Sequence, residues 1–127
     1  MELVATVIVL ALIEYQVFGM LVGRARGKYD VKAPVVSGNE VFERYYRVQQ
    51  NTAEQLIVFL PAITIYGFYG KSNIAAGAGL VFIIGRALYC RSYISDPASR
   101  GPGFLIGFVA TAFLLLGGLF VAARNLM

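Results

Sequence analysis

A polar stripe in the middle of the chain leads straight into an apolar stretch. On a helix, Arg47, Asn51 and Glu54 are spaced i, i+4 and i+7, so their side chains share one face. The chain then continues into residues 56–69, which are almost entirely apolar. Charged side chains at the edge of hydrocarbon are costly, and they persist mainly where they face a bundle interior or a wet cavity. We therefore expect this helix to carry the functional centre.

A second polar stripe follows further along the chain. Arg86, Tyr89 and Tyr93 are spaced i, i+3 and i+7, and Arg100 stands just before the last apolar run. If the two stripes meet, they line a cationic pocket with amide and hydroxyl groups, suited to an anionic ligand with several polar groups. The alternative is that the charges of the first stripe pair within one helix and that the tyrosines form an aromatic belt at the membrane surface.

The composition is that of an integral membrane protein. Hydrophobic residues make up 58% of the 127 residues and charged residues only 14%, and a chain this short cannot bury so much apolar surface in water. Most basic residues fall between apolar runs instead of forming a continuous patch, which argues against nucleic acid as a partner. With no histidine and one cysteine, the sequence excludes an internal disulfide and predicts no metal site.

Four apolar runs predict an all-α fold, an antiparallel up-down bundle of four helices in a single domain over residues 1–127. The expected spans are 3–22, 54–70, 74–94 and 104–123, each near the length that crosses a bilayer. The second helix should begin near Glu40, with Asn39 as its N-cap.

The links between the helices carry loop residues. Gly27, Pro34 and Gly38 predict a loop after the first span. Asp96-Pro97 predicts a capped turn or short helix, which residues 101–103 should end before the last span.

The first and third links are the basic ones. By the positive-inside rule, both lie in the cytoplasm and both termini lie on the other side. This orientation brings the two polar stripes to one membrane face, near the cytoplasm.

Glu14 lies deep in the first span and must be neutral or paired there. Arg86 is a candidate partner at similar depth, and a protonated carboxyl with a hydrogen bond to another helix is an equal alternative. Either state gives Glu14 a structural role and not a catalytic one.

The segment from Phe42 to Glu54 resembles a known signature. Its pattern E-R-x-x-R-x-x-x-N-x-x-E is similar to that of the MAPEG superfamily, the membrane-associated proteins in eicosanoid and glutathione metabolism. The set Arg86, Tyr89, Tyr93 and Arg100 repeats the spacing of its leukotriene C synthase branch, and residues 96–104 resemble the bacterial branch. The resemblance covers essentially the whole chain.

This resemblance implies a homotrimer in a bacterial inner membrane, with glutathione as co-substrate between neighbouring subunits. Carried over residue by residue, it implies that the peptide part of glutathione contacts Arg47, Asn51 and Glu54. It implies further glutathione contacts from Arg26, Gln49, Arg86, Tyr89 and Tyr93. Arg100 matches the arginine that stabilises the thiolate.

The implied activity is a glutathione transferase that conjugates lipophilic electrophiles and also reduces lipid hydroperoxides. Gln55 stands where the leukotriene branch has a tyrosine, so a bacterial-type detoxification role fits better than an eicosanoid substrate. The alternative is a non-enzymatic membrane scaffold or lipid-binding subunit. A transporter is disfavoured because the polar residues cluster at one membrane face.

Overall fold

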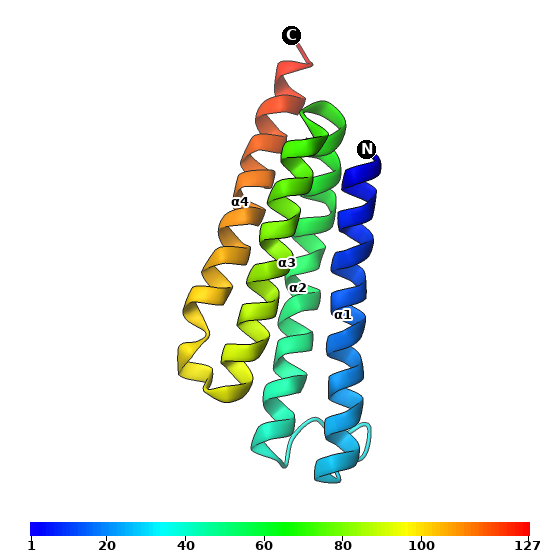
Figure 1. Ribbon diagram of the computed structural model, residues 1–127, viewed down its shortest axis with the longest axis vertical. Coiled ribbons are helices and arrows are strands. Elements are labelled where there is room, and N and C mark those ends of the chain that lie inside the picture. Colours follow the sequence, from blue (N-terminus) through cyan, green and yellow to red (C-terminus); the bar gives the residue numbers. More distant parts are fainter.

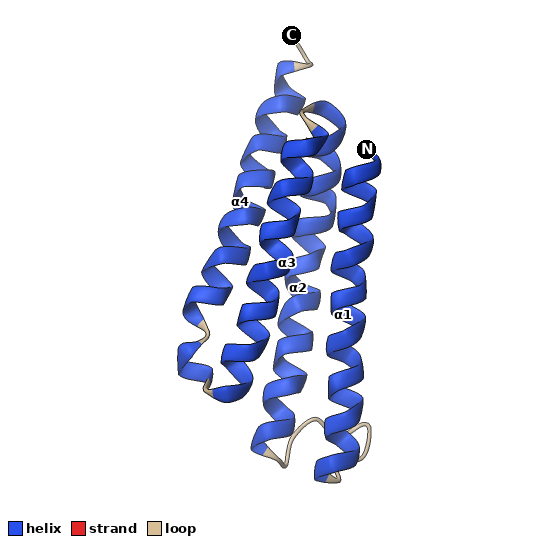
Figure 2. Ribbon diagram, viewed as in Figure 1, coloured by secondary structure: helices blue, strands red, loops and turns tan.

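The computed structural model describes residues 1–127 as a bundle of antiparallel helices (Figures 1 and 2). The helices are α1 (Glu2–Tyr29), α2 (Glu40–Tyr69), α3 (Ser72–Ser95) and α4 (Gly101–Arg124), with a 3-10 turn, η1 (Pro97–Ser99), before α4. Both termini and the α2–α3 link lie at one end, and the α1–α2 link and η1 lie at the other. The predicted all-α four-helix arrangement is confirmed.

Side-chain caps fix two of the starts as the sequence predicted. The side chain of Asn39 accepts a hydrogen bond from the Phe42 backbone N–H at 2.9 Å and so caps α2. The side chain of Asp96 accepts one from the Ala98 N–H at 3.1 Å and caps η1. Each cap satisfies a backbone donor that the helix itself leaves free.

The first helix is longer than predicted, because Gly27 lies inside α1 and not in a loop. The last turn carries Arg26 and Lys28, whose positive charges favour a helix C-terminus. The helix ends instead at Asp30, its C-cap, which adopts a left-handed backbone conformation with φ 54°. Aspartate tolerates this conformation better than most residues.

The start of α4 also differs from the prediction, since residues 101–103 begin the helix and do not break the chain before it. Pro102 fits the first turn because the backbone N–H that it lacks has no partner there. Gly103 is required by packing: a Cβ at this position would collide with the backbone of Tyr89. The first turn of α4 is therefore held directly against the part of α3 that carries Tyr89.

An apolar core joins the middle of the four helices. The rings of Phe59 and Phe82 stack with centroids 3.9 Å apart, and Val4, Ile63 and Leu114 are fully buried around them. This core lies between the end with the termini and the end with the polar stripes, and it fixes how α2 and α3 face each other.

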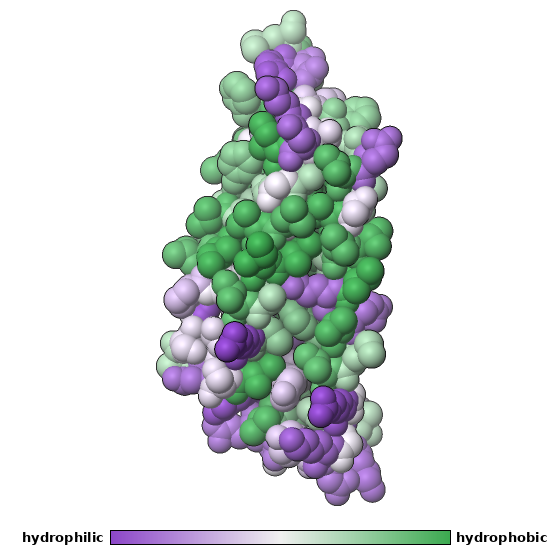
Figure 3. Space-filling view, in the orientation of Figure 1, coloured by the Kyte–Doolittle hydropathy of each residue, from purple (hydrophilic) through white to green (hydrophobic).

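Three segments are long and apolar enough to cross a membrane: α1, α3, and η1 with α4. The charged residues of α2 lower its mean hydropathy, although its second half packs among the other helices. On the face that Figure 3 shows, a broad hydrophobic band crosses the middle of the molecule and hydrophilic residues gather mostly toward the two ends. This distribution fits a bundle whose middle lies in hydrocarbon.

Candidate functional site

The two polar stripes meet in a hollow at the end opposite the termini. The hollow has a volume of about 490 Å³, and its walls come from the first half of α2, the second half of α3 and the start of α4. Its lining residues are Arg47, Asn51, Tyr89, Tyr93, Arg100, Gly101 and Phe104. One chain alone therefore brings together five of the residues that the sequence singled out.

Arg86 lies behind this hollow and does not line it. Its side chain is 1% exposed, and its Nη2 donates hydrogen bonds of 2.8 Å to Asn51 Oδ1 and to Thr52 Oγ1. Its guanidinium also lies 4.2 Å from the centre of the Tyr89 ring. The arginine thus contacts two lining residues from the protein side.

The contact with Arg86 sets which way the Asn51 amide points. Because Asn51 Oδ1 accepts from Arg86, the amide nitrogen is left with its two N–H donors. A ligand that Asn51 binds with this nitrogen must therefore supply an acceptor, such as a carboxylate or a carbonyl oxygen.

Arg47 and Glu54 form an ion pair along one face of α2, with Nη1 and Oε1 3.3 Å apart. Both side chains are about half exposed. Exposed pairs of this kind contribute little to stability, so both groups can exchange their partner for a bound ligand. The intrahelical pair proposed as the alternative interpretation is real, and Arg47 lines the hollow at the same time.

Arg100 stands at the N-cap of α4, at the mouth of the hollow. Its side chain is exposed and its Nη1 donates to the carbonyl oxygen of Pro97 at 2.9 Å. The guanidinium has five N–H donors in all, so this one bond leaves most of them available to an anion.

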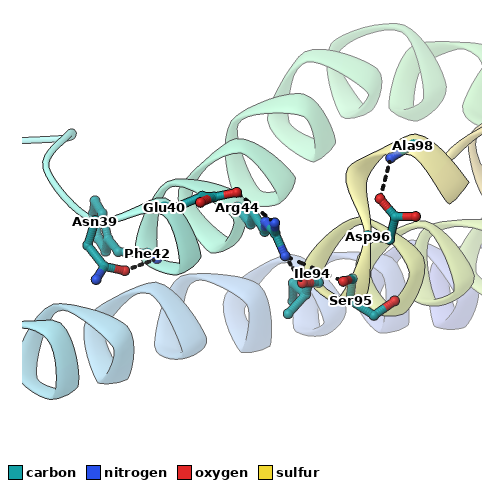
Figure 4. A network of polar contacts seen from close by, with 8 residues as sticks. All are labelled: Asn39, Glu40, Phe42, Arg44, Ile94, Ser95, Asp96 and Ala98. Atoms are coloured by element: carbon teal, nitrogen blue, oxygen red, sulfur yellow. Dashed lines mark hydrogen bonds and ion pairs between the residues drawn. The ribbon is translucent and has the colours of Figure 1, made fainter.

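Arg44 joins the start of α2 to the end of α3, a contact between distant segments that the sequence pattern does not predict. As Figure 4 shows, its guanidinium reaches the carbonyl oxygens of Ile94 and Ser95, at 3.0 and 3.4 Å, and Glu40 at 2.9 Å. These carbonyls belong to the last turn of α3 and have no partner within the helix. The only signal in the sequence is the i, i+4 spacing of Glu40 and Arg44.

Removing the hydrogen bonds from Arg44 to the end of α3 should make the segment that carries Arg100 more mobile. We expect Arg44→Met to lower the free energy of unfolding by about 1–2 kcal/mol, because charge-assisted bonds to two carbonyls are lost. Limited proteolysis should also become faster between residues 95 and 100. Thermal unfolding in detergent and mass mapping of the cleavage sites measure both effects.

The control is Glu40→Gln, which removes only the ion pair and keeps the bonds from Arg44 to α3. Glu40 is 83% exposed, so this change should cost less than about 0.5 kcal/mol. Equal losses in the two variants would contradict a clamp that acts through the carbonyls.

Arg26 and Gln49 lie away from the hollow. Arg26 donates to the carbonyl oxygens of Val31 and Val35, at 3.3 and 2.6 Å, and its guanidinium lies 4.9 Å from the centre of the Phe42 ring. Gln49 faces α1, where a Cβ on Gly19 would come within 2.9 Å of its Nε2. Two of the predicted site residues are therefore on the α1 side of α2, separate from the other predicted residues.

Glu14 is half-buried, and its Oε1 has no hydrogen-bond partner. No ion pair joins it to Arg86, whose bonds go to Asn51 and Thr52 instead. The candidate pairing of these two side chains is thus not formed.

The sequence of this chain is similar to those of known proteins. The family model described as "MAPEG family" matches residues 4–120. The chain belongs to the MAPEG family. Uncharacterized protein sll1147 of Synechocystis sp. is 43% identical over 115 residues, which cover 91% of this chain and 84% of that protein.

Two other MAPEG relatives carry names that state an activity. Human microsomal glutathione S-transferase 2 is 38% identical over 121 residues, covering 94% of this chain and 82% of the human protein. Guinea-pig leukotriene C4 synthase is 35% identical over 98 residues, covering 77% of this chain and 65% of that enzyme. These matches support a glutathione-related transferase role for this chain.

Proposed function

We propose that the protein is a membrane glutathione transferase that binds glutathione in the hollow and activates its thiol. The observation that carries this proposal is the convergence of Arg47, Asn51, Tyr89, Tyr93 and Arg100 on one hollow at one end of the bundle. Glutathione has two carboxylates, an ammonium and two peptide units. The guanidinium groups suit the carboxylates, the Asn51 N–H donors suit a carbonyl, and Glu54 suits the ammonium.

Arg100 is the group that we assign to the thiol. A thiol with an ordinary pKa of about 8.5 is only about 3% thiolate at pH 7, and lowering its pKa by about two units makes it mostly thiolate. A guanidinium from which the bound ligand excludes water can supply this shift, since each pKa unit needs about 1.4 kcal/mol of preferential interaction with the anion. The exposed donors of Arg100 at the mouth of the hollow suit this role.

The thiolate then reacts with a lipophilic electrophile from the bilayer. In conjugation a carbon–sulfur bond forms while the leaving group departs or the product takes up a proton. With a lipid hydroperoxide, the thiolate sulfur attacks the terminal oxygen, the oxygen–oxygen bond breaks, and the lipid oxygen leaves and takes up a proton to give the lipid alcohol and glutathione sulfenic acid. The thiol of a second glutathione then attacks this oxidised sulfur, which gives the glutathione disulfide and water. Phe104 in the lining and the exposed apolar side chains of α4, such as Leu105 and Phe108, offer such substrates a route from the membrane.

A homotrimer accounts for the two residues that lie outside the hollow. Arg26 and Gln49 are on the α1 side of the protomer, and the hollow is on the other side of α2. In a ring of copies, the α1 side of one protomer can face the hollow of the next. The glutathione site that we propose is then shared between subunits, near the cytoplasmic face of a bacterial inner membrane.

Calorimetry with the detergent-solubilised protein tests the ligand, and turnover with a panel of electrophiles tests the reaction. We expect micromolar to millimolar binding of glutathione, and weaker binding in Arg47→Gln than in the exposed control Arg91→Gln. Binding without any turnover, with the assembly intact, would favour the scaffold or lipid-binding alternative. If glutathione does not bind, it is excluded as the ligand of this hollow.

A further inference from the structure

A second hollow lies at the opposite end of the bundle, beside the C-terminus. It has a volume of about 360 Å³ and is formed by the end of α2, the start of α3 and the end of α4. Apolar side chains form most of it, among them Tyr66, Phe113 and Phe120, and Lys71 and Arg124 border it. It is therefore amphipathic, with two cations at an otherwise apolar surface.

Neither cation has an acidic partner within the protein. The three ion pairs of the chain join Met1 to Glu2, Arg44 to Glu40, and Arg47 to Glu54. The side chains of Lys71 and Arg124 make no hydrogen bond to any protein group, and α3 starts beside Lys71 without a side-chain cap. Arg124 is favourably placed in the last turn of α4, but no carboxylate pairs with it or with Lys71, so an anion is the complementary group at this hollow.

The depth of the hollow fits the boundary between lipid headgroups and acyl chains. Both cations lie at the ends of helices of 24 residues, which are about 36 Å long and so slightly longer than the hydrocarbon thickness. Ile74, Phe113 and Phe120 are exposed and continue from the hollow toward the middle of the bundle. Figure 3 shows hydrophilic residues at this end directly bordering the hydrophobic band.

We propose that this hollow binds one anionic phospholipid of the leaflet on the side of the termini. The phosphate lies between Lys71 and Arg124, and an acyl chain lies along Phe113 and Phe120. The apolar side chains exclude a free phosphate as the natural occupant, since they would gain nothing from it. The pair of cations distinguishes the site from ordinary lipid-facing surface. Each cation near an anionic lipid headgroup contributes favourable electrostatic free energy to binding.

The absence of tryptophan from the chain makes a local test possible. Phe120→Trp places a single fluorophore at the hollow, at a side chain that is 67% exposed and can be enlarged without disturbing the core. The variant is placed in phosphatidylcholine vesicles containing equal small fractions of either brominated phosphatidylglycerol or brominated phosphatidylcholine. Quenching by bromine reports which lipid occupies the site.

We expect phosphatidylglycerol to bind at this tryptophan on the order of tenfold more tightly than phosphatidylcholine. The preference should disappear when Lys71→Gln and Arg124→Gln are added, and persist when Lys32→Gln and Arg91→Gln are added instead. The second pair removes the same charge from exposed side chains elsewhere. A further control, Leu105→Trp near the other end of α4, should show little preference between the two lipids.

Four results would overturn the proposal. One is equal quenching by the two brominated lipids. Another is selectivity that survives the loss of both Lys71 and Arg124, measured singly if the double variant does not fold. The third is displacement of the lipid by inorganic phosphate at matched ionic strength, which would show that the site binds the free anion. A tryptophan that no lipid quenches would indicate that a second copy of the chain covers the hollow, and would also refute lipid binding.

Discussion

Replacing Arg100 with alanine is expected to lower turnover at pH 7 on the order of 25-fold while glutathione still binds. The estimate follows from the loss of a shift of about two pKa units, which returns the bound thiol from mostly thiolate to a few per cent. Binding persists because Arg47, Asn51 and the two tyrosines still line the hollow. The thiolate band in the ultraviolet, followed during titration with glutathione, measures the effect directly.

The dependence on pH separates this role from a general loss of structure. With Arg100 the bound thiol has a lowered pKa, so the rate should already be near its plateau at pH 7. Without Arg100 the rate should keep rising through the ordinary thiol pKa of about 8.5, and the two proteins should converge above it. Arg100→Lys keeps a cation and should fall between them. A constant ratio of the two rates at all pH values would exclude Arg100 from thiol activation.

Replacing Arg86 with methionine is expected to weaken glutathione binding about tenfold, although Arg86 does not line the hollow. The change removes the hydrogen bond that orients the Asn51 amide and the cation that lies over the Tyr89 ring. Such contacts are each worth on the order of 1–2 kcal/mol, and because they act on the ligand only indirectly, we expect about 1.4 kcal/mol of their loss to appear in binding, which is tenfold. Because Arg86 acts through these two residues, the loss should appear in KM and in the calorimetric affinity more than in kcat.

Two comparisons test this positioning role. Arg91→Met removes an exposed arginine from the same helix and should leave the affinity unchanged. Arg86→Lys keeps a donor for Asn51 but loses the planar group over Tyr89, so an intermediate affinity is expected. If Arg86→Met folds and binds glutathione like the wild type, the orientation of Asn51 does not depend on this arginine.

Local signals were sufficient for most of the helical architecture. The N-cap at Asn39 and the capped turn at Asp96 were predicted correctly, because each depends on a side chain and a backbone N–H only two or three residues away. The predictions failed at Gly27 and at the start of α4. In both cases a residue that favours loops lies within a helix, stabilised by the charges around the end of α1 or by the close contact with Tyr89.

The candidate site was predicted in part. Helical spacing placed Arg47 and Asn51 on one face and Tyr89 and Tyr93 on another, and the arrangement of the links predicted that these faces meet. Spacing could not distinguish Arg86 from the lining residues, because an i, i+3 neighbour of Tyr89 can point into the hollow or behind it. It also missed Arg44, whose partners lie 50 residues away in the chain.

The sequence by itself determined the helices, the membrane character and the end of the bundle where the polar groups gather, since these follow from hydropathy and from contacts within a few residues. Only the tertiary structure decided which of those groups share a hollow. It placed Arg86 behind Asn51 and Tyr89. It also left Glu14 without an ion pair to Arg86. Arg26 and Gln49 lie on the other side of α2 from the hollow. The physical reason is that the rotation of each helix about its axis is set by core packing, such as that of Phe59 on Phe82, between residues distant in the chain.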